Sequence, residues 1–195
     1  MQQLKLTHNL GRKAQTFSSE FLLAYLIFLL VLTSIFILWD TTNKNIMASE
    51  TLYNMENLGI NAVEKLIRTS GVPSNWSDAT SPDDILSLGL VNESRILNEK
   101  KVLKFIELMN TTVDTLCPSD IPSPRSNYNC SRYLLSIGKY EFYFELMDIN
   151  GTTLNLNGTR CTTGNYPSND DYKITLRRTA ILNNEIVRIR FTIWK

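Results

Sequence analysis

The residues best able to do chemistry lie just before a long apolar segment near the start of the chain. Arg12 and Lys13 form a basic pair that is followed by Ala14 and Gln15, and Glu20 comes after a short serine-rich stretch. A carboxylate at the edge of a membrane seeks a cation or a free amine on a neighbouring helix. This combination is an unusual way to begin a simple membrane anchor.

The element that must position these residues is an uncharged run of 19 residues from Phe21 to Trp39. At about 1.5 Å per residue it predicts a helix of about 28 Å, close to the roughly 30 Å hydrocarbon core of a bilayer. Glu20 and Asp40 bound the run on its two sides. We therefore expect a transmembrane helix over residues 15–40.

The flanks of this run predict its orientation and its retention. The leader, residues 1–14, contains Lys5, Arg12 and Lys13 but no acidic residue, so we expect it on the cytoplasmic side and the rest of the chain outside. The run ends in bulky residues up to Trp39, without the small residues of a secretory cleavage site. The sequence thus predicts a single-pass protein of the cell membrane with an extracytoplasmic domain.

These features together resemble the archaeal type IV pilin-like proteins, whose leaders are called class III signal peptides. The resemblance implies that a prepilin peptidase cuts between Ala14 and Gln15, so that the mature protein keeps its apolar helix. It also implies that Glu20 guides docking onto other pilin-like subunits. Glu20 would then be the sixth mature residue, whereas the family usually has this glutamate fifth. Cleavage after Gln15 would restore the family spacing but would place a glutamine before the bond.

Three short segments farther along also resemble pilin-like proteins after their long helix: Gly71 to Trp76, Leu88 to Leu90 and Leu97 to Lys101. The family function would be that of a structural subunit of a pilus-like surface assembly. The fairly large outer domain and its cysteines favour a minor pilin or pseudopilin over a major subunit.

A second interpretation remains open from the residues alone. Glu20 could be only the polar boundary of an ordinary anchor, and the outer domain could bind a ligand or partner without ever polymerising. Such a protein would keep its leader, and replacement of Glu20 by glutamine would have little effect.

Composition argues against several classes of function. The only histidine, His8, lies in the leader, so the outer domain lacks the commonest general base. The 20 basic and 19 acidic residues form no basic patch of the kind that nucleic-acid binding needs. The chain has no glycine-rich phosphate loop, nucleophile elbow or zinc-binding helix. We expect no enzymatic activity, cofactor or metal, and no direct contact with nucleic acid.

Acidic and basic clusters in the outer domain are interpreted as ordinary surface. Asp83-Asp84 and Asn169 to Asp171 lack the ligand spacing of an EF-hand, so solvated turns are favoured over calcium sites. Arg177 and Arg178 with Arg188 and Arg190 could form a cationic stripe for an acidic partner or glycan. An exposed sheet face, balanced across strands by Glu141 and Glu145, is the favoured interpretation.

Six Asn-x-Ser/Thr sequons all lie beyond the membrane run, where glycosylation enzymes could reach them. They are Asn75, Asn92, Asn110, Asn129, Asn150 and Asn157. We expect glycosylation at some of these sites.

Three cysteines lie on the outer side, where oxidation is plausible. A disulfide between Cys117 and Cys130 would close a proline-containing loop and stabilise the fold by about 3 kcal/mol in the entropic model. Cys161 could instead pair with either of them. A zinc site is disfavoured because histidine and Cys-x-x-Cys spacing are both missing.

Helical patterns follow the membrane run. Residues 41–45 are polar but contain no proline, and Ile46 to Arg68 has apolar residues at helical spacing, so we expect the membrane helix to continue over residues 41–70. Ser70-Gly71 and Pro73 would stop it. Asn98 predicts the N-cap of a further helix. The apolar side of that helix would carry Val102, Phe105, Ile106 and Met109.

From Ser131 onward the hydrophobic period changes to two, which predicts strands. The expected strands are Tyr140 to Ile149, Thr152 to Leu156 after the Asn150-Gly151 turn, Tyr172 to Leu182, and Glu185 to Trp194 after Asn183-Asn184. The last strand would bury Val187, Ile189, Phe191 and Ile193. The predicted fold class is therefore α+β, with a long N-terminal helix packed on a C-terminal antiparallel meander in a domain of residues 71–195.

Overall fold

The computed structural model describes residues 19–79, 82–109, 117, 119, 125–168 and 172–195. Its elements are α1 (Ser19–Arg68), η1 (Trp76–Asp78), η2 (Pro82–Asp84), β1 (Val91–Glu93), β2 (Ile96–Leu97), α2 (Glu99–Met109), α3 (Asn127–Leu134), β3 (Glu141–Met147), β4 (Asn155–Leu156), β5 (Thr159–Arg160), β6 (Thr162–Gly164), β7 (Lys173–Leu182) and β8 (Glu185–Trp194). The chain divides into two compact units, Met1–Ala48 and Ser49–Lys195, each described by itself below.

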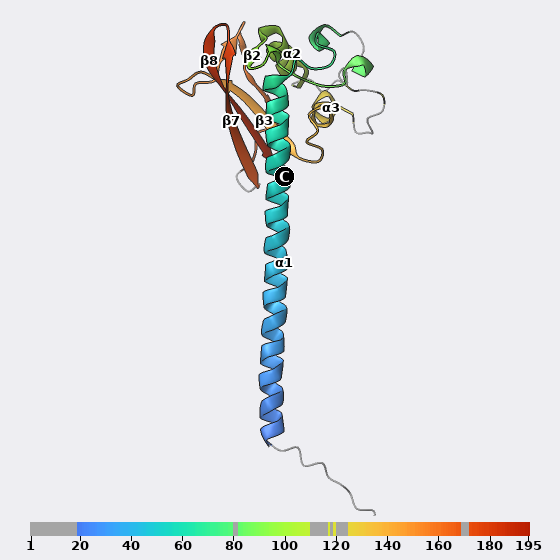
Figure 1. Ribbon diagram of the computed structural model, residues 1–195, viewed down its shortest axis with the longest axis vertical. Coiled ribbons are helices and arrows are strands. Elements are labelled where there is room, and N and C mark those ends of the chain that lie inside the picture. The colour runs from blue at the N-terminus through green and yellow to red at the C-terminus, as the bar shows by residue number, and fades with distance from the viewer. Residues whose placement is uncertain (1–18, 80–81, 110–116, 118, 120–124, 169–171) are drawn as a thin grey trace, which may run out of the picture. The chain divides into compact units, whose positions relative to one another are not determined.

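Helix α1 is unbroken from Ser19 to Arg68, as its sequence allows. It contains no proline, and its only glycine is Gly59. It ends where the sequence predicts a stop, since Gly71 adopts a positive φ of 85° and Pro73 follows. Figure 1 shows this helix in blue to green.

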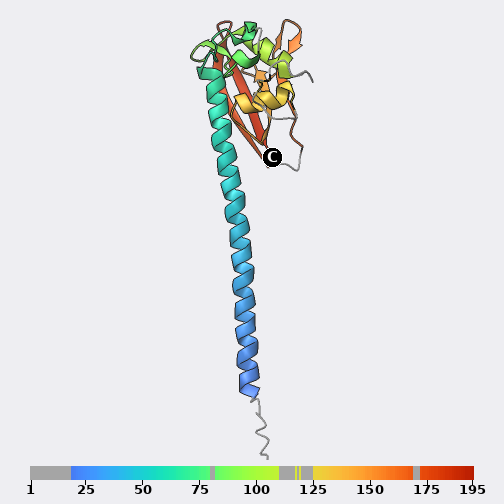
Figure 2. The same cartoon turned by 90° about the vertical axis from the view of Figure 1, so that its right-hand side faces the viewer.

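The second unit contains a mixed sheet whose strand order is β1-β2-β7-β8-β3-β6. All pairings are antiparallel except β2 with β7, which is parallel at Ile96 and Ile181. The turns of α1 from Ser49 onward lie beside β7 and β8 in both views (Figures 1 and 2). The predicted α+β class, a long N-terminal helix packed on a largely antiparallel sheet, is confirmed, but the strands do not follow one another as in the predicted meander, because β3 lies between β8 and β6.

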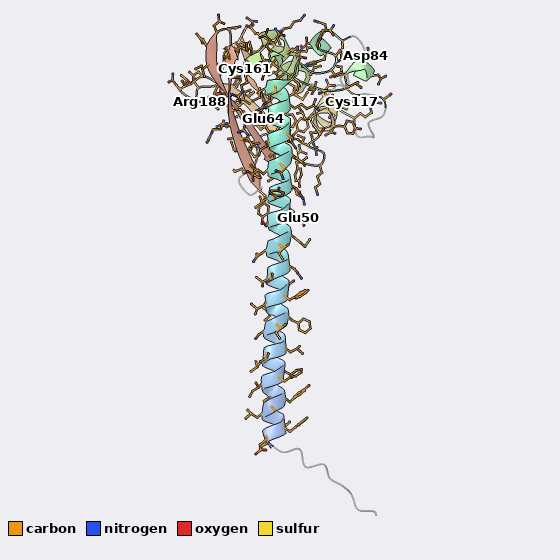
Figure 3. All side chains as sticks on the ribbon, in the orientation of Figure 1. Glu50, Glu64, Asp84, Cys117, Cys161 and Arg188 are labelled. Atoms are coloured by element: carbon orange, nitrogen blue, oxygen red, sulfur yellow. A yellow bond between two sulfur atoms is a disulfide. The ribbon has the colours of Figure 1, made fainter. Side chains whose placement is uncertain are left out.

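Gly59 is the point of closest approach between α1 and this sheet. A Cβ atom added there would lie 2.9 Å from Leu176 Cδ1 and 3.0 Å from Ile193 Cγ2. An ion pair between Glu64 Oε1 and Arg178 Nε, 2.7 Å apart, joins the same two elements one turn later. Figure 3 labels Glu64 on this part of the helix.

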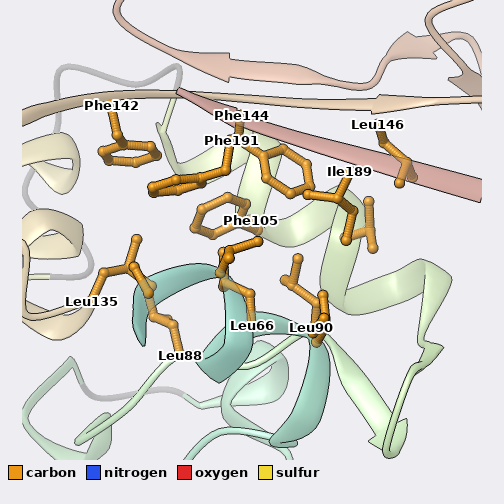
Figure 4. Close-up of a cluster of buried hydrophobic side chains, with 14 of the residues drawn as sticks. Leu66, Leu88, Leu90, Phe105, Leu135, Phe142, Phe144, Leu146, Ile189 and Phe191 are labelled. Carbon is orange, nitrogen blue, oxygen red and sulfur yellow. The ribbon is translucent and has the colours of Figure 1, made fainter. Parts of the chain in front are cut away.

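The core of the second unit lies between α1, α2 and the inner face of the sheet (Figure 4). Phe142 stacks on Phe191 with ring centroids 5.5 Å apart, and Phe105 of α2 meets Phe144 edge-on at 5.4 Å. Leu66 of α1 is fully buried beside them. Complete burial of such side chains contributes about 1.5–3 kcal/mol each, so this cluster is the main source of the domain's stability.

The β7–β8 hairpin forms where the sequence predicts it. Asn183 and Asn184 both have positive φ, 51° and 65°, as a two-residue turn of type I′ requires. The predicted inward face of β8 is buried: Val187, Ile189, Phe191 and Ile193. The predicted helix after Asn98 is also confirmed, because Asn98 Oδ1 accepts a hydrogen bond from the Lys101 amide at 3.1 Å at the start of α2.

The predicted return strand over Thr152 to Leu156 is only partly confirmed. After the Asn150-Gly151 turn the chain pairs with the end of β3 at the Met147–Thr153 bridge, where the Leu154 amide donates to the Leu146 carbonyl and the Asp148 amide donates to the Thr152 carbonyl, each at 2.9 Å. A second turn at Asn157-Gly158 folds the chain back on itself, so Asn155–Leu156 pairs with β5 instead. Strand β6 then pairs with β3 at Tyr143 to Glu145. It occupies the part of that edge along which the predicted strand would have continued.

The expected change to strand period at Ser131 is also wrong, because residues 127–134 form helix α3. Ser126 caps it by accepting a hydrogen bond from the Asn129 amide at 3.2 Å. From this helix the Tyr128 hydroxyl accepts from the Phe142 amide at 2.9 Å and lies 3.2 Å from its carbonyl oxygen. The tyrosine thus provides a hydrogen-bond partner for the Phe142 backbone of β3, which lies past the last residue that pairs with β6.

A buried lysine was not foreseen from the sequence. Lys101 is 4% exposed, and its Nζ donates to the carbonyl oxygens of Ser70 and Val91, each at 2.9 Å. Burial lowers the pKa of this ammonium group. The two hydrogen bonds join the chain just after α1 to β1 through α2.

The ion pair at Glu64 predicts a pH-dependent contribution to stability. Hydrogen bonding by Arg178 holds the pKa of Glu64 below its ordinary value, although burial opposes this shift. A carboxyl whose pKa is lower in the folded state stabilises the fold above its unfolded-state pKa and loses this effect as the pH falls through the folded value. We expect Glu64→Gln to lower the unfolding free energy by up to about 1 kcal/mol at pH 7, with a much smaller difference at about pH 3.

The measurement is urea unfolding of the full chain in detergent micelles, followed by near-ultraviolet circular dichroism at both pH values. Glu50→Gln, on the same helix but exposed, is the matched control and should behave like wild type. An equal deficit for Glu64→Gln at both pH values would contradict the assigned role.

Candidate functional site

The candidate site is the apolar surface of α1 from Phe21 to Trp39, in the first unit of the chain. Every large apolar side chain of this segment except the partly exposed Leu32 is exposed in the structure. By length and composition this helix can span a membrane, a test that an anchor and a signal sequence both pass. The segment therefore needs an apolar environment that the described residues of its unit do not provide.

The Ser and Thr hydroxyls of this segment, and that of Thr41 just beyond it, are satisfied within the helix. The hydroxyls of Thr33, Ser34 and Thr41 donate to carbonyl oxygens four residues earlier, at 2.7, 2.8 and 2.9 Å. Such bonds let hydroxyl side chains lie in hydrocarbon without an unsatisfied donor. Just past the run, Lys44 Nζ pairs with Asp40 Oδ2 at 2.6 Å, which places the first full charges at its C-terminal end.

Glu20 is the second residue of α1 and lies in its first turn. The free amide groups and the dipole of a helix N-terminus favour a negative charge there. Among the residues that the structure describes, Glu20 has no ion-pair partner. The structure thus places the carboxylate at the start of the apolar helix, whereas Lys13, Ala14 and Gln15 around the expected cleavage bond lie outside the described residues.

The sequons differ in accessibility. Asn75, Asn92, Asn150 and Asn157 are exposed, and Asn110 lies outside the described residues. Asn129 is half-buried within α3, and the hydroxyl of Ser131, the third residue of its sequon, is buried and donates to the Asn127 carbonyl at 2.7 Å. Four of the described sequons are therefore accessible to glycosylation enzymes in the folded domain, and Asn129 is not.

The cysteines resolve into one disulfide and one thiol. Cys117 and Cys130 are bonded, with Cα atoms 5.2 Å apart, and Cys161 is free and buried. Cys161 lies well away from Cys117 (Figure 3), so of the pairings that the sequence left open the structure contains the short loop. Burial raises the pKa of the Cys161 thiol.

The remaining polar clusters are surface features of different kinds. Asp83 Oδ1 accepts a hydrogen bond from the Ser119 amide at 2.6 Å, so this acid participates in a turn contact. Asn169 to Asp171 lie outside the described residues. Within the described part of the chain, no three histidine, cysteine or acidic side chains are grouped as metal ligands would be.

The four-arginine stripe, the less favoured interpretation of these residues, does not exist as one surface. Arg178 lies on the inner face with Glu64, whereas Arg177 has an exposed side chain on the opposite face. The predicted balance by Glu145 holds, because this carboxylate pairs with Arg190, but Glu141 pairs with Arg132 of α3 at 2.8 Å. Strand alternation alone separates Arg177 from Arg178 and could have shown this from the sequence.

Comparison of the chain with protein-family models, with curated proteins and with solved structures found no match. Any function must therefore be inferred from the exposed apolar helix, from Glu20 and from the surface of the second unit.

The disulfide and the buried free thiol together predict how many cysteines can be alkylated under each condition. In the native, unreduced chain Cys161 should resist alkylation by iodoacetamide at pH 8, because its thiol is buried and its raised pKa leaves little thiolate. Denaturation without reductant should give one alkylated cysteine, and denaturation with reductant should give three. Peptide mapping by mass spectrometry reads out each site. Labelling of Cys117 or Cys130 without reduction would contradict the pairing.

Proposed function

We propose that this protein is a structural subunit, of the minor pilin or pseudopilin kind, of an archaeal type IV pilus-like surface assembly. The observation that carries the proposal is the uncovered apolar surface from Phe21 to Trp39, with the Glu20 carboxylate in the turn that begins it. The subunit would be stored in the membrane through this helix, and would join neighbouring pilin-like subunits through it after a prepilin peptidase removes the leader.

The apolar surface supports both states of such a subunit. Exposure of apolar area to water costs about 25 cal/mol per Å², so a helix of this kind stays in lipid or against other apolar helices. Exchange of lipid for neighbouring helices changes little hydrophobic free energy, and packing and polar contacts then decide assembly. The same side chains can therefore hold the stored subunit and line the centre of a filament.

Glu20 supports specific docking for an electrostatic reason. A carboxylate near an apolar interface is poorly solvated, and pairing with a cation recovers part of that cost. The free amino group created by leader cleavage on an adjacent subunit is such a cation. Because Glu20 has no ion-pair partner within the described residues of its own chain, it remains free for this contact.

The second unit supports a role at the cell surface. It has its own hydrophobic core and a disulfide, which oxidising conditions outside the cytoplasm favour. Its exposed sequons would allow glycans on the outer surface of an assembly. The outer domain is accordingly extracytoplasmic in this proposal.

Substitution of Glu20 tests the proposal. Glu20→Gln keeps the size of the side chain and removes its charge, so we expect loss of filaments with unchanged membrane insertion. Glu50→Gln removes a charge from an exposed position on the same helix outside the apolar run and should assemble normally. Both variants are expressed with a prepilin peptidase and the assembly proteins, and sheared filaments are counted by electron microscopy.

Alkaline extraction of membranes and native alkylation of Cys161 confirm that each variant inserts and folds. Wild-type amounts of filaments from Glu20→Gln would contradict docking through this carboxylate. That result would favour a permanently anchored binding domain, for which the charge is only a boundary.

A further inference from the structure

We propose that the outer face of the sheet binds an acidic polysaccharide at a cluster formed by Lys173, Arg177 and Arg190 with Tyr143 and Tyr166. We call these five residues the basic–tyrosine cluster. The proposal concerns a surface of the second unit and does not depend on whether the protein polymerises.

Strand register gathers the cations of this cluster on one face. Arg177 of β7 lies directly opposite Arg190 of β8, and Lys173 comes four residues earlier on the same side of β7. Arg188, two residues before Arg190, continues the basic surface, and Figure 3 shows it on the side of the sheet away from α1. Like charges directly opposite each other destabilise a strand pair. A bound anion would relieve this repulsion.

Among the described acids of the same face, Glu145 neutralises Arg190, and Lys173 and Arg177 have no such partner. Glu145 is 4% exposed, and its carboxylate is engaged by Arg190 and by the Thr153 hydroxyl at 2.5 Å. Glu141 pairs with Arg132, which comes from α3. Lys173, Arg177 and Arg188 make no ion pair within the described residues, so the described part of this face carries excess positive charge.

Two tyrosines add an aromatic surface beside the charges. The rings of Tyr143 and Tyr166 meet edge to face with centroids 5.1 Å apart, and Tyr166 is 76% exposed. Between these rings and the cations lies a shallow hollow of about 150 Å³, smaller than the pockets that hold drug-sized ligands. Its floor includes the hydroxyls of Thr175 and Thr192, 3.2 Å apart. The hollow thus suits one unit of a longer chain.

These groups match an acidic sugar better than an acidic peptide. A peptide that joins a sheet uses the backbone groups of a free edge, whereas this cluster is made by side chains on the face of β7, β8 and β3; β2 pairs with β7 only at Ile96 and Ile181, so the polyglutamate comparison below tests binding of a peptide. Guanidinium groups bind carboxylate or sulfate through paired hydrogen bonds, and hydroxyls serve the sugar's own hydroxyls. An exposed tyrosine ring offers a flat apolar surface with a polar tip, on which the C–H face of a sugar ring can lie.

Binding to defined polymers tests the assignment. The full chain in detergent micelles is titrated with polygalacturonate, which carries carboxylates, and with dextran sulfate, while neutral dextran and polyglutamate serve as comparisons. We expect micromolar-range binding of at least one acidic polysaccharide that weakens strongly with added salt. The acidic polysaccharide that binds more tightly shows whether the site prefers carboxylate or sulfate groups. Equal or tighter binding of polyglutamate, or no binding of either acidic polysaccharide, would overturn the proposal.

Variants locate the site on the surface. Arg177→Gln should weaken binding about tenfold, whereas Arg95→Gln, an exposed arginine in the β1–β2 turn, should leave it unchanged. Tyr166→Leu should weaken binding and Tyr166→Phe should retain it, because stacking requires the ring and not the hydroxyl. Wild-type affinity in Arg177→Gln, or equal effects of the two arginine variants, would overturn the assignment. Native protection of Cys161 verifies that each variant is folded.

Discussion

One constraint dominates the first unit, the apolar surface of α1 that the described residues of this unit leave uncovered. From Phe21 to Trp39 the helix has no charged residue, and its Ser and Thr hydroxyls are satisfied by carbonyl oxygens of the same helix. Such a surface is unstable in water and stable in lipid or among similar helices. From Ser49 onward the same helix is amphipathic instead, and it buries Met55, Gly59 and Leu66 in the domain core. One helix therefore has an apolar segment suited to lipid or to other helices and an amphipathic segment that packs in the domain core.

Much of the fold could be predicted because local patterns agree with tertiary packing. The apolar residues of α2 and β8 alternate with the periods of a helix and a strand, and each predicted inward face is buried. Asn183 and Asn184 specify a tight turn that accepts two positive φ angles. The placement of Glu20 in the first turn of a long apolar helix also follows from its position directly before the uncharged run.

The missed features depend on contacts between distant residues. Helix α3 buries Asn127, Cys130 and Ser131, polar or small residues that a hydrophobic pattern does not register. The strand expected after Asn150-Gly151 pairs with β3 only around Thr153, because β6 occupies the rest of that edge, and local sequence does not determine which segment pairs there. The basic–tyrosine cluster was likewise not predicted from the sequence. Tyr166 comes from a loop and Lys173 from the start of β7, and only the fold brings them together.

The most direct test of a stored and processed subunit is the intact mass and amino-terminal sequence of the chain after coexpression with an archaeal prepilin peptidase. The proposed function predicts a mature protein that begins at Gln15 or Thr16 and retains the whole apolar helix. A start at Met1 would contradict processing and indicate a permanent anchor. Loss of the entire segment through Trp39 would contradict the membrane-stored subunit altogether and indicate a secreted domain.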